Sequence, residues 1–368
     1  MPNYPNLSLQ KPRSSTFLYR QFTVYFHCSV ADLDNLINHS SLPIEYLGYL
    51  GKIAKNFVWF IMQLHLVVNT FGSDLQRRYG EKIYKLTLHG GFSCPNRDGT
   101  IGQGGCTFCN VASIIDESIQ IKSISDQLLS QAKQMKKSKR YLAYFQAYTS
   151  TYAEVEILKT MYQEALHSAD IVGICVGTRP DCVPKEALNL LADYQDQGYE
   201  VWLELGLQTA HDKTLHHINR GHTFNDYHQT VQKARQLGIK VCTHLIIGLP
   251  KEIKQDNLIT LNRVLDSGVD GLKIHPLHIV EGSIMAKTWR AGRIDVLSLE
   301  KYVDIAGDII RQTPAHILYH RISANARKPT LLAPDWCENH WQSMNAVDNN
   351  LRQFGAQGSA IGDPYYFE

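Results

Sequence analysis

Residues 89–110 read HGGFSCPNRDGTIGQGGCTFCN, and no other part of the chain is as informative. They contain three cysteines, Cys94, Cys106 and Cys109, among six glycines. Cys106 and Cys109 have C-x2-C spacing, so one turn can present two thiolates, and Cys94 can return along the loop to supply a third. Glycine permits sharp turns and a close approach of backbone N–H groups to sulfur. The segment therefore predicts a loop that gathers three thiolates around one metal centre.

Three thiolates suit an iron–sulfur cluster with one open iron. A [4Fe-4S] cubane has four irons, so three cysteine ligands leave one of them free of protein ligands. The amine and carboxylate of S-adenosylmethionine (SAM) can chelate that iron, and one electron from the cluster then cleaves SAM to a 5′-deoxyadenosyl radical. A Cys3His zinc site with His89 as fourth ligand is the main alternative, although structural zinc sites usually consist of two ligand pairs. Inert buried thiols are the remaining interpretation.

Around this loop the chain alternates between strand and helix patterns. Apolar runs rich in β-branched and aromatic residues lie at 83–88, 141–148, 171–176, 201–207, 241–247 and 271–279. Segments with helical spacing lie at 124–132, 155–165, 184–192, 227–237, 257–267 and 299–311. Six such repeats predict a parallel sheet with right-handed crossovers. We expect an α/β fold, a partial (βα)6 barrel with its ligands at the C-terminal ends of the strands; a full eight-stranded barrel is the alternative.

The first 61 residues differ in character, being rich in aromatic residues, Asn and Ser without a sustained period. Gln63 and His65 interrupt the apolar run that begins at residue 57, so we expect no membrane span. We expect residues 1–61 to be an extension that is poorly ordered or absent from the native protein, with Met62 as the true start. The barrel core should span 62–318, with 319–368 packed on it as a C-terminal extension.

The bulk composition excludes little. The chain is 44% hydrophobic and 20% charged with a net charge of +2, as in ordinary globular proteins. A local basic groove would still suffice for nucleic acid, so this balance neither supports nor excludes it. The eight cysteines include a single C-x2-C pair, and prolines at 2, 5 and 12 break any early apolar run. We therefore expect free thiols or ligands rather than disulfides, and a cytoplasmic location.

Several short motifs resemble the bacterial YhcC-like radical SAM family. They are CPNRDGT at 94–100, CTFCN at 106–110, TRPD at 178–181, ELGLQ at 204–208, NRGHT at 219–223 and GLP at 248–250. That family is similar to the radical SAM domain of the catalytic subunit of elongator, which also has a lengthened first cysteine gap. The resemblance runs from Met62 to near the C-terminus. It implies a [4Fe-4S] cluster, SAM, and an electron donor such as flavodoxin or ferredoxin.

Seven residues are candidates for contacts with SAM: Phe108, Gln146, Thr149, Arg179, Glu204, Gln208 and Arg220. Gln146 and Thr149 stand where many members of the superfamily have Gly-Gly-Glu. Arg179 follows a strand and offers a planar fork to a carboxylate, the alternative being a salt bridge to Asp181. Glu204 lies among apolar neighbours, so it needs either a ligand or an internal ion pair.

Two further patterns bear on the substrate. His275 and His278 suggest a metal pair, but the period of a strand should send them to opposite faces. The basic stretch 320–329, followed by Trp336 and Trp341, could track an RNA backbone, or could be a solvated segment.

The leading hypothesis is therefore a radical SAM enzyme that abstracts hydrogen from a substrate, with the wobble-uridine side chain of tRNA as the substrate that the elongator resemblance suggests. No acetyltransferase domain fits after the barrel, so the complete elongator reaction is not implied. A radical SAM enzyme acting on a small metabolite or peptide, and a non-catalytic zinc-stabilised binding module, are the alternatives.

Overall fold

The computed structural model describes residues 64–110, 122–135, 140–168 and 170–367. The chain divides after Met62 into two units, and the described residues all belong to the second. The extension expected at 1–61 lies outside the described residues. Within the described part, no helix is both long and apolar enough to cross a membrane.

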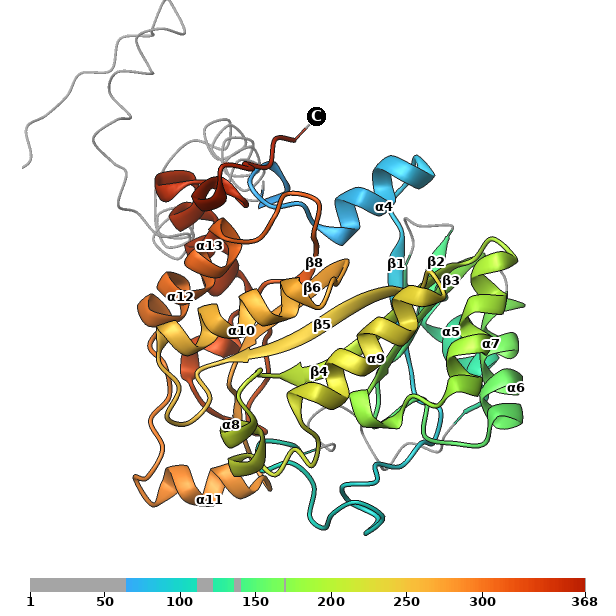
Figure 1. The fold of residues 1–368 in the computed structure, drawn as a ribbon, viewed down its shortest axis with the longest axis horizontal. Coiled ribbons are helices and arrows are strands. Elements are labelled where there is room, and N and C mark those ends of the chain that lie inside the picture. The colour runs from blue at the N-terminus through green and yellow to red at the C-terminus, as the bar shows by residue number, and fades with distance from the viewer. Residues whose placement is uncertain (1–63, 111–121, 136–139, 169, 368) are drawn as a thin grey trace, which may run out of the picture. The chain divides into compact units, whose positions relative to one another are not determined.

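A seven-stranded parallel sheet forms the centre of this unit (Figure 1), in the order β1-β2-β3-β4-β5-β6-β8. The strands are β1 (Tyr84–Leu88), β2 (Tyr141–Phe145), β3 (Ile171–Thr178), β4 (Glu200–Gln208), β5 (Lys240–Ile247), β6 (Gly271–Pro276) and β8 (Leu318–Arg321). The first six coincide with the expected strands, and the sheet stays open between β1 and β8, which confirms the α/β partial barrel. The sequence LYHR of β8 is too short and polar to be recognised as a strand, yet it pairs with β6 and carries the sheet past residue 318.

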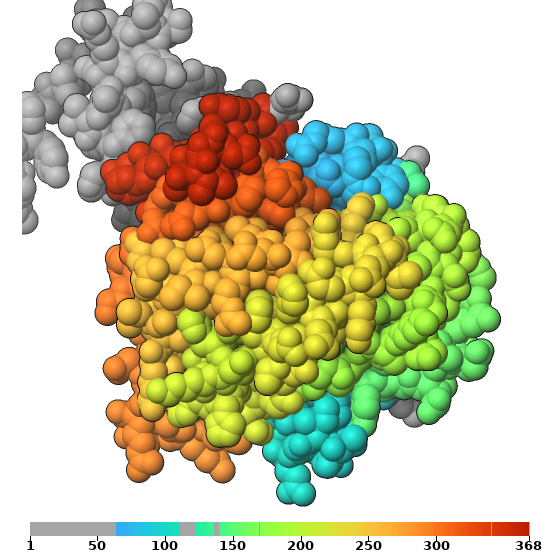
Figure 2. Space-filling view, in the orientation of Figure 1, coloured from blue at the N-terminus to red at the C-terminus, as the bar shows by residue number. Residues whose placement is uncertain are grey.

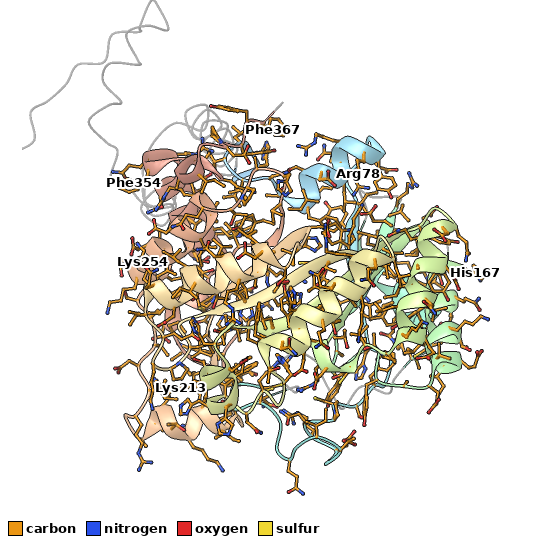
Figure 3. All side chains as sticks on the ribbon, in the orientation of Figure 1. Arg78, His167, Lys213, Lys254, Phe354 and Phe367 are labelled. Atoms are coloured by element: carbon orange, nitrogen blue, oxygen red, sulfur yellow. The ribbon has the colours of Figure 1, made fainter. Side chains whose placement is uncertain are left out.

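Helices occupy the connections between the strands, and one helix lies before β1 (α4) and one after the short strand β9, Leu331–Ala333 (α13). They are α4 (Phe71–Tyr79), α5 (Ile124–Gln134), α6 (Val155–Leu166), α7 (Lys185–Asp196), α8 (Asp212–His217), α9 (Phe224–Gln236), α10 (Lys254–Asp266), α11 (Ile284–Arg290), α12 (Leu299–Arg311) and α13 (His340–Phe354). Figure 2 shows the side chains of α9 and α10, in yellow and light orange, covering one face of the sheet. Lys254, labelled in Figure 3, begins α10 and forms ion pairs with Asp304 and Asp308 of α12, so neighbouring helices are also joined at the surface.

The inner strands β2–β6 are buried along nearly their whole length, as expected for a parallel sheet covered on both sides. Every residue of β3 is buried, and so is every residue of β4 except the last. The covering helices are amphipathic, and α12 buries residues such as Tyr302, Ile305 and Ile309 on one face. Ser298 caps this helix by accepting a hydrogen bond from the N–H of Lys301.

The N-terminal end of the barrel is closed by α4. In Figure 1 this helix lies at the top, at the opposite end of the strands from α8 and α11. Phe71 and Leu75 of α4 join a buried cluster with Trp202. Arg78, labelled in Figure 3, binds both carboxylate oxygens of Glu200 at 2.7 and 3.0 Å. With this end sealed, the C-terminal ends of the strands form the accessible side of the barrel.

Residues beyond β8 pack against the barrel. A short strand, β9 (Leu331–Ala333), pairs antiparallel with β7 (Ile279–Val280). Near the end of the chain, the Gln357 amide donates to the carbonyl oxygens of Pro314 and Ile317, at 2.8 Å in both cases.

Candidate functional site

A cavity of about 420 Å³ lies at the C-terminal ends of the strands. It is lined by all ten residues singled out from the sequence: Cys94, Cys106, Phe108, Cys109, Gln146, Thr149, Arg179, Glu204, Gln208 and Arg220. The cysteines come from the loop after β1, and the other residues come from that loop, β4 and the segments that follow β2, β3 and α8. Segments far apart in sequence therefore converge on one site.

The cysteine loop is shaped by its own backbone. The N–H groups of Arg97 and Asp98 donate to the Cys94 carbonyl at 2.7 and 3.0 Å, and the Cys109 N–H donates to the Cys106 carbonyl at 3.0 Å. Two tight turns thus present the three sulfur atoms to the same cavity, with Cys106 the most buried of them.

Hydrogen-bond donors lie close to the sulfur of Cys106 and to the backbone of Cys109. Arg220 Nη1 lies 3.4 Å and Asn96 Nδ2 3.6 Å from Cys106 Sγ, and both are donors. Arg97 Nη2 donates to the Cys109 carbonyl at 2.9 Å. Burial raises the pKa of the Cys109 thiol in spite of the nearby Arg97 and Arg220, but donors of this kind can hydrogen-bond to sulfur that is bound to metal. Three thiolates around a cavity with cationic surroundings fit a [4Fe-4S] cluster.

The mononuclear zinc alternative fits less well. His89, its proposed fourth ligand, does not line this cavity, and its Nδ1 accepts a hydrogen bond from the Gly91 N–H at 3.0 Å. Among the described residues, no three His, Cys, Asp or Glu side chains converge closely enough to hold one metal ion.

The paired cysteines are clamped from two sides through Thr107. Its N–H donates to the Ile218 carbonyl at 3.0 Å, and its carbonyl accepts from the Met285 N–H at 2.9 Å. Gly105, just before the pair, has φ of +76°, and a Cβ there would lie 2.9 Å from Arg97 Nε. Glycine is therefore required at this position, both for the turn and for the close approach of Arg97.

Three of the candidate SAM contacts carry polar atoms without a partner. Thr149 Oγ1, Arg179 Nη1 and Gln208 Oε1 are buried and make no hydrogen bond within the described structure. Leaving such an atom unpaired costs about 1–3 kcal/mol, so three in one cavity indicate a polar ligand. Arg179 combines both interpretations, because its Nε and Nη2 bind the Asp181 carboxylate at 3.0 and 2.8 Å while Nη1 stays unpaired.

Glu204 has internal partners instead. Its Oε1 accepts from Lys85 at 2.5 Å and His320 at 3.2 Å, and its Oε2 from His244 at 2.9 Å and from Lys273. Burial alone would raise the pKa of Glu204, but the charges of Lys273 and Lys85 outweigh it and hold the pKa well below its usual range. Both oxygens are occupied, so the geometry favours the internal ion pair over a contact with SAM.

The remaining candidates have mixed surroundings. Arg220 donates through Nε and Nη2 to the Gly206 carbonyl at 3.2 and 2.6 Å, and its third nitrogen contacts Cys106, so it supports the cysteine loop. Phe108 packs partly against the apolar cluster that includes Met285. Gln146 lies at the cavity wall.

One expectation about the last strands is wrong. His275 and His278 do not diverge, because β6 ends at Pro276 and the chain turns, so both line the cavity with ring centroids 6.2 Å apart. Arg321, from the basic stretch, lines the cavity because it belongs to β8. Lys328, from the same basic stretch, is exposed but paired with Asp335 at 3.1 Å. The position of Arg321 could have been predicted only by recognising β8 as a strand, and its sequence LYHR contains no apolar run that would mark it as one.

Comparisons with known proteins agree with this geometry. The radical SAM superfamily model matches residues 97–264, and the radical SAM C-terminal domain model matches residues 269–353. Protein YhcC of Escherichia coli K12 is 65% identical over 304 residues, covering 83% of this chain and 98% of that protein. A tRNA uridine(34) acetyltransferase of Dehalococcoides mccartyi is 29% identical over 171 residues, covering 46% of this chain and 36% of that protein.

The fold is also shared with a solved structure, the archaeal Elp3 of Methanocaldococcus infernus with an N-terminal deletion. It aligns with a TM-score of 0.57 at 15% identity, covering 75% of this chain and 64% of that chain. Enzymes of the matched superfamily use a [4Fe-4S] cluster and SAM, which confirms the expected cofactors. The chain therefore belongs to the radical SAM superfamily, in the family of Protein YhcC.

Proposed function

We propose that Cys94, Cys106 and Cys109 hold the cluster and that Thr149, Arg179 and Gln208 bind SAM beside it. The observation that carries this proposal is the presence of three unpaired, buried polar atoms in the cavity that the three cysteines line. When bound, the cluster supplies the electron that cleaves SAM reductively, as in other members of the superfamily. The protein side chains position SAM, keep bulk water from the buried part of the site and orient the substrate.

Reconstitution under anaerobic conditions tests this assignment. Protein with a full iron complement, reduced with dithionite, is expected to convert SAM to 5′-deoxyadenosine and methionine. Gln208→Ala is expected to raise the Kd for SAM by about tenfold, the loss of one well-placed hydrogen bond in a buried site. Cluster-loaded protein that produces no 5′-deoxyadenosine would contradict the proposal.

For the substrate, we propose the wobble uridine of a tRNA. The support comes from the 29% identity to a protein named tRNA uridine(34) acetyltransferase, over 46% of this chain. Comparison of modified nucleosides in total tRNA from a deletion strain and its parent tests it. A change confined to wobble uridines is expected, and identical nucleoside profiles would refute it.

A small metabolite or peptide is the second candidate, and one observation favours it. Arg321 lies within the cavity and Lys328 is tied to Asp335 and Glu338, which removes two of the cations expected to track an RNA backbone. Under this alternative, total tRNA would show only weak, nonspecific affinity for the cluster-loaded protein. Either substrate requires an electron donor, for which flavodoxin or ferredoxin is our proposal.

A further inference from the structure

The cavity has a second wall that the SAM assignment does not use. Beyond the cysteine loop and the β2–β4 segments, it is lined from β5, β6 and β8 by His244, His275, His278 and Arg321. Tyr144 of β2 and the backbone of 324–326 complete this side. His244, His275, His278 and Arg321 come from the β5–β8 half of the chain's sheet order, whereas Thr149, Arg179 and Gln208 come from its β2–β4 half.

Arg321 is the unusual member of this wall. Its guanidinium makes no hydrogen bond or ion pair with any described residue, and its Nε is buried. His278 Nε2, on the same wall, is also buried without a partner. A buried guanidinium nitrogen without an acceptor is costly, since a polar N–H taken out of water needs a hydrogen bond. A ligand that supplies an acceptor to these atoms would remove this cost.

The charged side chains near this wall carry a net positive charge. Among the described residues, three cations lie in this part of the barrel, Lys85, Lys273 and Arg321, and one carboxylate, Glu204, faces them. The histidines do not alter this count, because burial lowers the pKa of His244 and His278 to about 4 and that of His275 well below its usual value. Burial also lowers the pKa of Lys273 to about 8, which still leaves it largely protonated at neutral pH. A site with excess positive charge and a free guanidinium fork is complementary to an oxyanion.

We propose that the β5–β8 wall binds an oxyanion of the substrate, a carboxylate or a phosphate, through the guanidinium of Arg321. This rests on the proposed function, since it places the substrate in the same cavity as SAM. The planar fork of arginine can bind two oxygens at once, which fixes the orientation of the anion as well as its position. The reacting carbon of the substrate is thereby held between the anion site and the SAM side of the cavity.

Titration with small anions tests the site without requiring turnover. Inorganic phosphate and succinate are titrated separately into cluster-loaded protein, with and without SAM, at constant ionic strength set by potassium chloride. At least one is expected to bind saturably with one site per chain, and which one binds distinguishes the phosphate from the carboxylate. Arg321→Met is expected to weaken that binding by about tenfold or more, as for the loss of one charge-assisted contact. Arg321→Lys keeps the charge without the fork and should fall between the two.

Arg327→Met is the matched control, because Arg327 is an exposed cation six positions away in the same stretch, and its affinity should stay within twofold of the native protein. Circular dichroism and iron content check the fold, and if Arg321→Met does not fold, Arg321→Lys carries the comparison. No saturable binding of either anion to the native protein, or equal affinities in the native protein and the folded Arg321 variants, would overturn the proposal. A failure of SAM cleavage would appear in a separate assay and would count against the proposed function instead.

Discussion

The two walls of the cavity are built in different ways. The wall from β1 to β4 carries the three cysteines on a loop with tight turns at Cys94 and Cys106, and Thr149, Arg179 and Gln208 on it each have one unpaired polar atom. The wall from β5 to β8 is made of strand residues, backed by a charged network centred on Glu204 that joins β1, β4, β5, β6 and β8. The first wall is suited to a fixed chemistry that many proteins share. The second depends on long-range assembly and is suited to the choice of substrate.

The largest effect is expected on the first wall. Cys94→Ala, Cys106→Ala or Cys109→Ala should abolish both cluster binding and SAM cleavage, because each removes one of only three thiolates. Iron content and 5′-deoxyadenosine formation measure the outcome.

The control for these variants is Cys175→Ala or Cys242→Ala, since both cysteines are buried and neither lines the cavity. Both should retain iron and activity. Full iron content in the Cys94 variant would mean that the cluster is held in another way.

Glu204→Gln is expected to have the next largest effect, on stability. It leaves Lys85 and Lys273 buried without their counter-charge, and breaking a buried ion pair in this way costs about 3–5 kcal/mol. Urea denaturation measures the change in the free energy of unfolding. Glu281→Gln, which removes an exposed pair with Arg290 at the surface, should leave that free energy unchanged. Equal values for the two variants would show that the network does not hold the strands together.

The second wall should also make the protein sensitive to mild acid. The pKa values of His244 and His278 are about 4 in the folded protein, against 6.5 for an ordinary histidine. Between these pH values the unfolded chain binds more protons than the folded one, so stability falls as pH drops from about 6.5 to 4. The slope is roughly 1.4 kcal/mol per pH unit for each histidine. Urea midpoints measured across this range should show it.

His278→Asn should reduce this acid slope, whereas replacement of the exposed His216 by Asn should leave it unchanged. A protein whose stability does not vary between pH 6.5 and 4 would show that these histidines are protonated in the folded state.

The smallest effect is expected from Thr149→Val. Its hydroxyl has no partner, so its removal should leave the stability unchanged or slightly higher and raise the Kd for SAM about fivefold, the equivalent of roughly 1 kcal/mol. Thr243→Val should have the opposite pattern. The Thr243 hydroxyl lies 2.6 Å from the Tyr227 hydroxyl, to which it is hydrogen-bonded, and Thr243 does not line the cavity. It should cost about 1 kcal/mol of stability without altering SAM affinity. Calorimetry and urea denaturation separate the two effects.

The same contrast explains what could be predicted from the sequence. The first wall is encoded in short contiguous motifs, so Cys94, Cys106, Cys109 and the neighbouring candidates could be found before any fold was known. Six strands were also predictable, because each is rich in apolar, β-branched and aromatic residues.

The second wall was not predictable in the same way. Arg321 belongs to a four-residue strand with no apolar run, and it reaches the cavity only because β8 pairs with β6. The ion pairs of Glu204 likewise depend on Lys85 and Lys273, which lie far from it in sequence. Local patterns contain no information about such long-range pairings.

The hydrogen bond between Thr107 and Met285 couples retention of the cluster to the local unfolding of α11, a helix that is far from the cysteine loop in sequence. The Thr107 carbonyl accepts from the N–H of Met285, which lies in the first turn of α11. Local unfolding of α11 therefore releases one side of the turn that carries Cys106 and Cys109. By linkage, a ligand that binds only the closed form must disfavour that opening. Insertion of the cluster should thus slow amide exchange across α11, and exposure of α11 should be a route by which the cluster is lost.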